Sequence, residues 1–99
     1  MITVELSIEF RDWLAELTDR KASAIIVKRI RQIEASSLGD TKRIGDGLFE
    51  VRIHYGPGYR LYAMNRGRQW ILLLCGSSKS DQSRAIKQAK QLAKEAHDA

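Results

Sequence analysis

The stretch that decides the fold runs from Leu48 to Gly76 and reads LFEVRIHYGPGYRLYAMNRGRQWILLLCG. From its second residue to Tyr55 the side chains alternate between apolar or aromatic and charged or polar, which is the period-two pattern of a β-strand. One face of this expected strand carries Phe49, Val51, Ile53 and Tyr55. The other face carries Glu50, Arg52 and His54. The pattern predicts a strand with one buried face and one polar face.

Two turns continue this strand into an antiparallel sheet. Gly56-Pro57-Gly58 predicts a tight turn, because proline fixes one φ angle and glycine accepts a positive φ. Residues 59–66 are expected to form the return strand, with a second hairpin turn around Gly67. Residues 69–76 (QWILLLCG) are apolar on both faces, which is typical of a strand covered from both sides.

Helical patterns lie before and after this sheet in the chain. Residues 2–6 predict a short strand and residues 36–40 a loop. Ser7 and Asp19 are expected to cap two helices, because each side chain can accept from an orphan N–H of the first helical turn. Apolar residues recur at helical spacing in residues 10–17, 22–33 and 85–93. The predicted order, β-α-α-β-β-β-α, defines an α+β fold with an antiparallel sheet, two N-terminal helices and a C-terminal helix.

Length and composition limit the classes of protein to consider. The 99 residues form one domain, residues 1–99, because a second core would have no room. A composition of 43% hydrophobic and 29% charged residues excludes a disordered or low-complexity chain. The apolar run from Trp70 to Cys75 is far shorter than the ~20 residues of a membrane span. The single cysteine fits a reducing compartment. We therefore expect a soluble cytoplasmic protein with no membrane contact.

The positive charge is concentrated in the second half of the chain. Residues 1–40 contain six Lys or Arg against seven acids, whereas residues 41–94 contain eleven against three. A basic half of this kind favours a polyanionic partner such as nucleic acid, or an acidic partner segment. A basic surface that serves solubility alone is the alternative that charge leaves open.

A candidate site lies across the Gly-Pro-Gly hairpin. Arg52 and His54 are two residues apart on one strand, and Arg60 and Tyr62 are two apart on the next. If the hairpin closes in the usual register, these four side chains share one polar face. Further cations flank them at Lys42, Arg43 and Lys79.

This combination suits a phosphodiester. Cations on a rigid sheet can bind it and stabilise the charge that develops during its cleavage. His54 is the natural general base or acid, because an unperturbed imidazole titrates near neutral pH. The alternative reading is an ordinary strand surface, on which the charges discourage aggregation and the histidine is exposed.

Other reactive side chains point to no further site. Cys75 lies in an apolar strand without a basic neighbour, so a packing role is expected. One cysteine and two distant histidines offer no metal-ligand spacing, and no cofactor motif is present. His97 belongs to a terminal segment that is expected to fray.

Three spaced motifs together resemble a known family. They are G-D-x-K from Gly39, E-x-R-x-x-x-G-P-G-Y-R from Glu50, and G-x-x-K-x-x-Q from Gly76. The runs GDTKRIGDGLFEVRIHYGPGYRLY and ILLLCGSSKSDQSRAIKQAK that contain them resemble the RelE/ParE superfamily of bacterial toxins. The similarity is greater to its HigB-like branch of addiction-module killer proteins, and it extends over nearly the whole chain.

The resemblance implies a toxin of a type II toxin–antitoxin system that a helix-turn-helix antitoxin neutralises. In the mRNA-cleaving members, the toxin enters the ribosomal A site, and the ribose 2′-hydroxyl attacks the adjacent phosphate without a metal or other cofactor. By position, Arg52 and Arg60 would hold the scissile phosphate, and His54 would be the candidate base. Tyr62 would orient or stack, and Glu50 would be structural. Lys79 joins Arg52, His54, Arg60 and Tyr62 in the expected catalytic set and would also contact RNA. The other expected RNA contacts are Lys42, Arg43, Arg66, Arg84 and Lys87.

One departure from the family pattern leaves the activity open. Many ribosome-dependent members keep a catalytic Tyr or His near the C-terminus, where this chain has His97 alone. The ParE branch shares the fold but inhibits DNA gyrase and has no nuclease site. The sequence therefore leaves three functions to consider, namely a toxin ribonuclease, a gyrase inhibitor and a non-toxic nucleic-acid-binding module.

Overall fold

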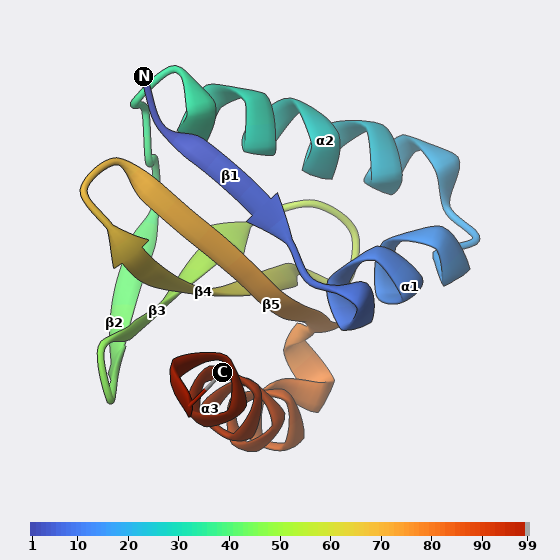
Figure 1. Ribbon diagram of the computed structural model, residues 1–99. Coiled ribbons are helices and arrows are strands. Elements are labelled where there is room, and N and C mark those ends of the chain that lie inside the picture. The colour runs from blue at the N-terminus through green and yellow to red at the C-terminus, as the bar shows by residue number, and fades with distance from the viewer. Residues whose placement is uncertain (99) are drawn as a thin grey trace.

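The computed structural model describes residues 1–98, and the side chains of residues 1–96 (Figure 1). Within this range the chain forms five β-strands, three α-helices and one 3-10 helix, η1. In chain order they are β1 (Thr3–Leu6), α1 (Ile8–Glu16), α2 (Arg20–Glu34), β2 (Thr41–Gly45), β3 (Leu48–Ile53), β4 (Tyr59–Gly67), β5 (Trp70–Ser78), η1 (Lys79–Asp81) and α3 (Gln82–Asp98). The side chain of His97 lies outside the described residues.

Both predicted N-terminal caps are confirmed. The Ser7 hydroxyl accepts from the Phe10 N–H at 2.9 Å and begins α1. The Asp19 carboxylate accepts from the N–H groups of Lys21 and Ala22 and begins α2. Each cap satisfies backbone donors that a helix start leaves unpaired.

None of the helices that the structure describes has the length and apolar content that crossing a bilayer requires.

The five strands form one mixed sheet in the order β1-β5-β4-β3-β2. Strands β2 to β5 are antiparallel neighbours, as the sequence predicts for β3, β4 and β5. β1 is the difference, because it pairs with β5 in parallel, with Thr3 opposite Trp70. The chain leaves β1 through α1 and α2 and reaches the far edge of the sheet, so the first and last strands meet as neighbours.

Strand β2 is missing from the predicted order of elements. The sequence TKRIG has one strongly apolar residue, Ile44, and two glycines follow closely at Gly45 and Gly47. Such a segment lacks the apolar alternation that identifies a half-buried strand. It forms a strand because it is the outer edge of the sheet and pairs with β3 alone. The α+β class is confirmed, with one more strand than predicted.

The helices cover both faces of the sheet, as Figure 1 shows. Helices α1 and α2 lie on one face and α3 lies on the other. The core under α1 and α2 includes Phe10, Ile26, Ile33, Val51, Leu61 and Leu73. The core under α3 includes Leu48, Tyr62, Leu74, Cys75, Ala85 and Ala89. The prediction that β5 is covered from both sides is therefore confirmed.

Trp13 of α1 packs directly onto β5 at Gly76. A Cβ atom at Gly76 would lie 2.4 Å from two carbons of the Trp13 ring. The ring also lies against Phe10 and Tyr59, at centroid distances of 5.7 Å and 6.2 Å. The absence of a side chain at Gly76 thus sets how closely α1 approaches the sheet.

We expect Gly76→Ala to destabilise the fold by about 1–3 kcal/mol, because the added methyl group overpacks the Trp13 contact. Gly67→Ala is the matched control, since no atom lies within 4 Å of a Cβ there. Denaturant unfolding of both variants measures the two free energies. Equal midpoints for the two variants would contradict the close contact.

Candidate functional site

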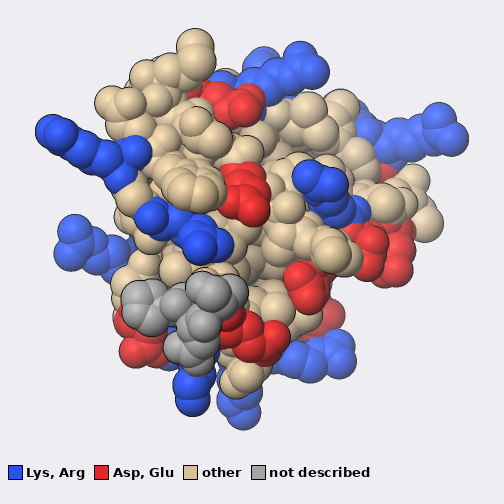
Figure 2. Space-filling model, viewed as in Figure 1, with Lys and Arg blue, Asp and Glu red and all other residues tan. Residues whose placement is uncertain are grey.

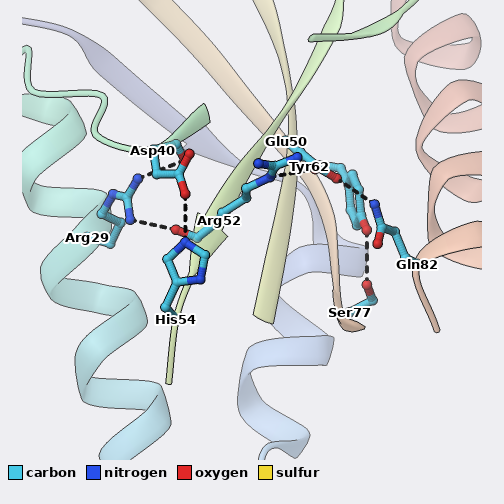
Figure 3. A network of polar contacts seen from close by, with 8 residues as sticks. All are labelled: Arg29, Asp40, Glu50, Arg52, His54, Tyr62, Ser77 and Gln82. Atoms are coloured by element: carbon cyan, nitrogen blue, oxygen red, sulfur yellow. Dashed lines mark hydrogen bonds and ion pairs between the residues drawn. The ribbon is translucent and has the colours of Figure 1, made fainter. Parts of the chain in front are cut away.

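The register of β3 and β4 brings three predicted site residues onto one sheet face. Glu50 lies opposite Tyr62, and Arg52 lies opposite Arg60. This is the face that α3 covers, and Gln82 at the start of α3 reaches it. We call Glu50, Arg52, Arg60, Tyr62, Ser77 and Gln82 the polar cluster; Figure 3 shows all of these except Arg60.

Glu50 is the fully buried acid of the polar cluster, with 0% exposure. Its carboxylate accepts from Arg52 Nε at 3.0 Å and from Gln82 Nε2 at 3.2 Å (Figure 3). A carboxylate taken out of water is tolerated only when it is paired and hydrogen-bonded. Glu50 therefore fixes Arg52 and ties α3 to the middle of the sheet, which agrees with its predicted structural role.

Arg60 is the unusual member, because it is a nearly buried cation without a carboxylate partner. Its exposure is 7%, and its Nε has no hydrogen-bond partner among the described residues. It faces Arg52 directly, and like charges in opposed positions of a sheet destabilise it. The single carboxylate of Glu50 leaves the two arginines with a net positive charge. This arrangement suits an anion that would complete the missing hydrogen bond.

Tyr62 is buried beneath the arginines and does not reach the surface. Its ring is 0% exposed, and its hydroxyl lies 3.2 Å from Ser77 Oγ. Burial raises the pKa of the Tyr62 phenol, so this group stays protonated at neutral pH. The expectation that Tyr62 stacks on a base is wrong, because a ring without exposed surface offers no face to a ligand. It supports the cluster from below instead.

His54 lies outside the polar cluster. β3 ends at Ile53, and the imidazole turns toward the loop that precedes β2 (Figure 3). There its Nε2 lies 2.6 Å from Asp40 Oδ2, with the His54 side chain 70% exposed. The register of β3 and β4 therefore does not extend to His54, whose observed partner is Asp40 and not Arg52, Arg60 or Tyr62.

Asp40 is held in place from two further sides. Its carbonyl oxygen accepts from the Arg52 N–H at 2.9 Å and from Arg29 Nη2 at 3.1 Å. Arg29 also donates to the carbonyl oxygens of Leu38 and Arg52. The Asp40–His54 pair is thus anchored to α2 and to the same strand that carries Arg52. The hydrogen bond from His54 lowers the pKa of the Asp40 carboxyl from its ordinary value of 3.8.

Lys79 stands beside the hairpin turn. Its backbone N–H donates to the carbonyl oxygen of Gly58 at 2.8 Å. A Cβ atom added at Gly58 would lie 3.5 Å from Lys79 Cβ, so the two residues are in close contact. Gly58 has a φ of +82°, so the turn itself depends on glycine. Lys79 therefore begins η1 next to the turn that joins β3 to β4, and its side chain is exposed.

The other predicted RNA contacts are spread over the molecule. Lys42 lies opposite Glu50 and shares the face of the polar cluster, whereas Arg43 lies opposite Phe49 on the reverse face. Arg66 is six residues from Arg60 along β4, about 20 Å away. It lies over the Trp70 ring, 5.4 Å from the centroid. On α3, Arg84 pairs weakly with Asp81 at 3.9 Å, and Lys87 lines a cavity beside Met64.

No uniformly basic face is visible in the view of Figure 2, where acidic side chains interrupt the Lys and Arg side chains. The expected basic surface is therefore divided between α3, the sheet edge and the β4–β5 turn. Lys42, Arg52 and Arg60 lie on one face of the sheet by register, and Lys79 lies beside the turn that joins β3 to β4.

Cys75 has the packing role that its sequence context predicts. It is 2% exposed, and burial raises the pKa of its thiol to about 12. Within the described residues no group of three or more His, Cys, Asp or Glu side chains is placed to hold a metal ion.

Four residues of the site were not singled out from the sequence, namely Arg29, Asp40, Ser77 and Gln82. Asp40 and Gln82 belong to the spaced motifs G-D-x-K and G-x-x-K-x-x-Q, which were the available signal for them. Arg29 and Ser77 carry no such signal. Their roles depend on contacts between segments 9 to 23 residues apart in the chain.

The fold and site can now be compared with known proteins. The structure is similar to a chain of the toxin–antitoxin complex RelBE2 from Mycobacterium tuberculosis, with a TM-score of 0.61 and 21% identity. That match covers 79% of this chain and 98% of the other, and it shows a RelE-like fold. No protein-family model matches the chain.

A sequence relative defines the family more narrowly. An uncharacterised protein of Haemophilus influenzae is 43% identical over 94 residues, which cover 95% of each chain. This chain belongs to the same family as that protein.

The two opposed arginines should differ in their effect on stability. We expect Arg52→Ala to cost about 3 kcal/mol, because it leaves the buried Glu50 carboxylate with Gln82 alone. Arg60→Ala leaves no protein group unpaired and removes a like-charge contact, which offsets part of the packing lost with its buried stem, so its free energy of unfolding should fall less than that of Arg52→Ala. Denaturant unfolding measures both values.

Adding Glu50→Gln to Arg52→Ala provides the control, because it removes the unpaired charge while keeping the side-chain volume. Most of the lost stability should return in the double variant. A loss that persists there would show that Arg52 stabilises the fold by packing and not by pairing with Glu50.

The Asp40–His54 pair should contribute stability that disappears in acid. Because the folded-state pKa of Asp40 is lowered, this contribution is complete above its ordinary value of 3.8 and is lost as the pH falls through the lower folded value. Wild-type protein and Asp40→Asn should therefore differ in stability at neutral pH and converge as the pH falls below 3.8. Unfolding midpoints across this range test it, and a difference that stays constant with pH would contradict it.

Proposed function

We propose that this protein is the toxin of a type II toxin–antitoxin system, of the HigB-like branch, and cleaves mRNA on the ribosome. The observation that carries the proposal is the guanidinium of Arg60, which is nearly buried, faces Arg52 and lacks a partner for Nε. A cation in such a position destabilises the free protein and gains hydrogen bonds from a phosphate. The RelE-like fold supports the same function by analogy.

In the proposed reaction the substrate supplies its own nucleophile. The ribose 2′-oxygen bonds to the adjacent phosphorus and gives up its proton, and the bond from phosphorus to the 5′-oxygen breaks. The 5′-oxygen takes a proton as it leaves, so the products are a 2′,3′-cyclic phosphate and a 5′-hydroxyl. Arg52 and Arg60 would stabilise the extra charge on the phosphate oxygens in the transition state.

The proton-transfer role is assigned to His54. Its imidazole is exposed, and Asp40 holds one ring nitrogen at 2.6 Å. An acid in this position fixes the orientation of the ring and stabilises the imidazolium that forms when the other nitrogen accepts a proton. Arg52 connects the two parts of the site, because its side chain belongs to the polar cluster and its backbone binds Asp40.

The cations around the polar cluster would hold the RNA backbone. Lys42 and Lys79 border the cluster, and Arg84 lies near it at the start of α3. Arg43, Arg66 and Lys87 lie away from the cluster and would contact RNA elsewhere on the ribosome. The proposal implies action in the cytoplasm, where ribosomes and mRNA are found, and a helix-turn-helix antitoxin as the neutralising partner.

The decisive substitution is Arg60→Ala. We expect it to lower cleavage by about 10²–10³-fold, the effect of losing one donor that stabilises a transition-state anion. Arg60→Lys should restore part of the rate, since a lysine keeps the charge but not the planar guanidinium. The measurement is the mapping of new 5′ ends on a defined message in a translating bacterial extract.

Arg68→Ala serves as the charge-matched control, because Arg68 is exposed in the β4–β5 turn. It should cut at the wild-type rate. Wild-type rates in Arg60→Ala would overturn the assignment of the site, and wild-type rates in His54→Ala would remove the imidazole from the mechanism. If the folded protein stops growth without cutting RNA, gyrase supercoiling is the activity to measure. If induced expression leaves growth unchanged, the toxin proposal fails.

A further inference from the structure

A cavity of about 750 Å³ opens at the end of β5, between α1, the β3–β4 turn and α3. We call it the β5-end pocket. Its floor is buried and consists of Tyr59, Gly76, Ser77 and Ala85. Its volume lies within the range of ~300–1,000 Å³ that small-molecule sites occupy. The proposed reaction assigns no ligand to it.

One wall of the β5-end pocket is a flat aromatic surface. The Trp13 ring lies against the bare backbone of Gly76, and the Tyr59 ring meets it edge-on at 6.2 Å. Trp13 lines the pocket, and an indole ring can stack on a planar ring. Unpaired RNA bases are recognised in this way, by stacking on aromatic side chains.

The rim of the pocket carries groups that can read the edge of a base. Asp81, Arg84 and Gln88 are exposed and line the opening. The Asp81 carboxylate and the Arg84 guanidinium are 3.9 Å apart, a weak ion pair that leaves both with free hydrogen-bonding capacity. Guanine matches this pair, since a carboxylate can accept from its N–H donors and arginine can donate to O6 and N7.

The pocket adjoins the place where the phosphate would bind. Ser77 lines the pocket floor and lies opposite Arg60 in the register of β4 and β5. Residues in opposed positions have Cα atoms about 4.5–5.5 Å apart. Ser77 Oγ also contacts the Tyr62 hydroxyl inside the polar cluster (Figure 3). A base in the pocket would therefore belong to a nucleotide that flanks the phosphate at Arg60.

We propose that the β5-end pocket binds one unstacked RNA base, with a preference for guanine, beside the phosphate held by Arg60. This inference rests on the proposed function, because it takes RNA as the ligand of the polar cluster. Trp13 provides the stacking surface, and Asp81 and Arg84 read the edge of the base. The pocket would thereby determine which nucleotide accompanies the scissile phosphate.

The two tryptophans of the chain allow a direct binding test. Trp13 lies in the pocket, whereas Trp70 lies at the far end of β5 and serves as an internal reference. The probes are 2′-O-methyl trinucleotides, which the proposed reaction cannot cleave, with guanine, adenine or no base at the central position. Titrations monitored by the two indole N–H signals in NMR spectra give the dissociation constants. Trp70→Phe assigns the signals.

We expect the guanine trinucleotide to shift the Trp13 signal, to leave Trp70 unchanged, and to bind about tenfold more tightly than the abasic one. Asp81→Asn should reduce that difference and leave the abasic affinity nearly unchanged. Arg84→Gln should reduce the same difference and also weaken the abasic probe, because Arg84 is one of the cations expected to hold the RNA backbone. Lys94→Gln removes a charge from the same helix about 15 Å from Arg84 and should leave the difference intact. These rim substitutions are exposed and leave the core unaltered.

The outcomes separate this inference from the proposed function. Equal binding of the guanine and abasic probes, or no detectable binding by the wild-type protein, overturns the base-binding pocket. Equal binding of guanine and adenine overturns the preference. If rim variants change base-dependent binding while translating extracts show no cleavage, the pocket is supported and the ribonuclease proposal fails.

Discussion

The buried carboxylate of Glu50 is the interaction on which the arrangement of the rest depends. It lies in the middle of β3 with no exposed surface, so it must be paired, and its two partners come from β3 itself and from the first residue of α3. It therefore fixes where α3 begins over the sheet. It also neutralises one arginine of an opposed pair and leaves the other without a counter-charge. The position of α3 and the uncompensated positive charge of the site have the same origin.

Much of the fold could be predicted because local patterns and tertiary structure agree. The alternation from Phe49 to Tyr55, the Gly-Pro-Gly turn and the apolar run before Gly76 each specify their own strand. β2 could not be predicted from its own residues, because its pairing with β3 makes it a strand. The parallel pairing of β1 with β5 also cannot be predicted from the residues of β1, since it depends on the path of the chain through α1 and α2 to the far edge of the sheet.

The candidate site could also be predicted in part, where local pattern was sufficient. Period two was enough to place Arg52, Arg60 and Tyr62 on one face. It did not predict the partner of His54, because Asp40 lies 14 residues away in the chain. Nor does an alternating pattern distinguish a solvated polar face from one covered by a helix. The burial of Glu50, Arg60 and Tyr62 follows from the position of α3, which the pattern of β3 does not contain.

The pairing of β1 with β5 also has a consequence for the order in which the chain can fold. Ser7 binds Leu74 across 67 residues of sequence, so the first strand remains without its partner until most of the polypeptide has been synthesised. Contacts of such wide separation form late and slowly, because the intervening chain must first be closed into a loop. The polar cluster needs β3, β4, β5 and the first residue of α3. A nascent chain that ends before Gln82 therefore has no such cluster, and the charge arrangement of the site exists only after the first residue of α3 has been added.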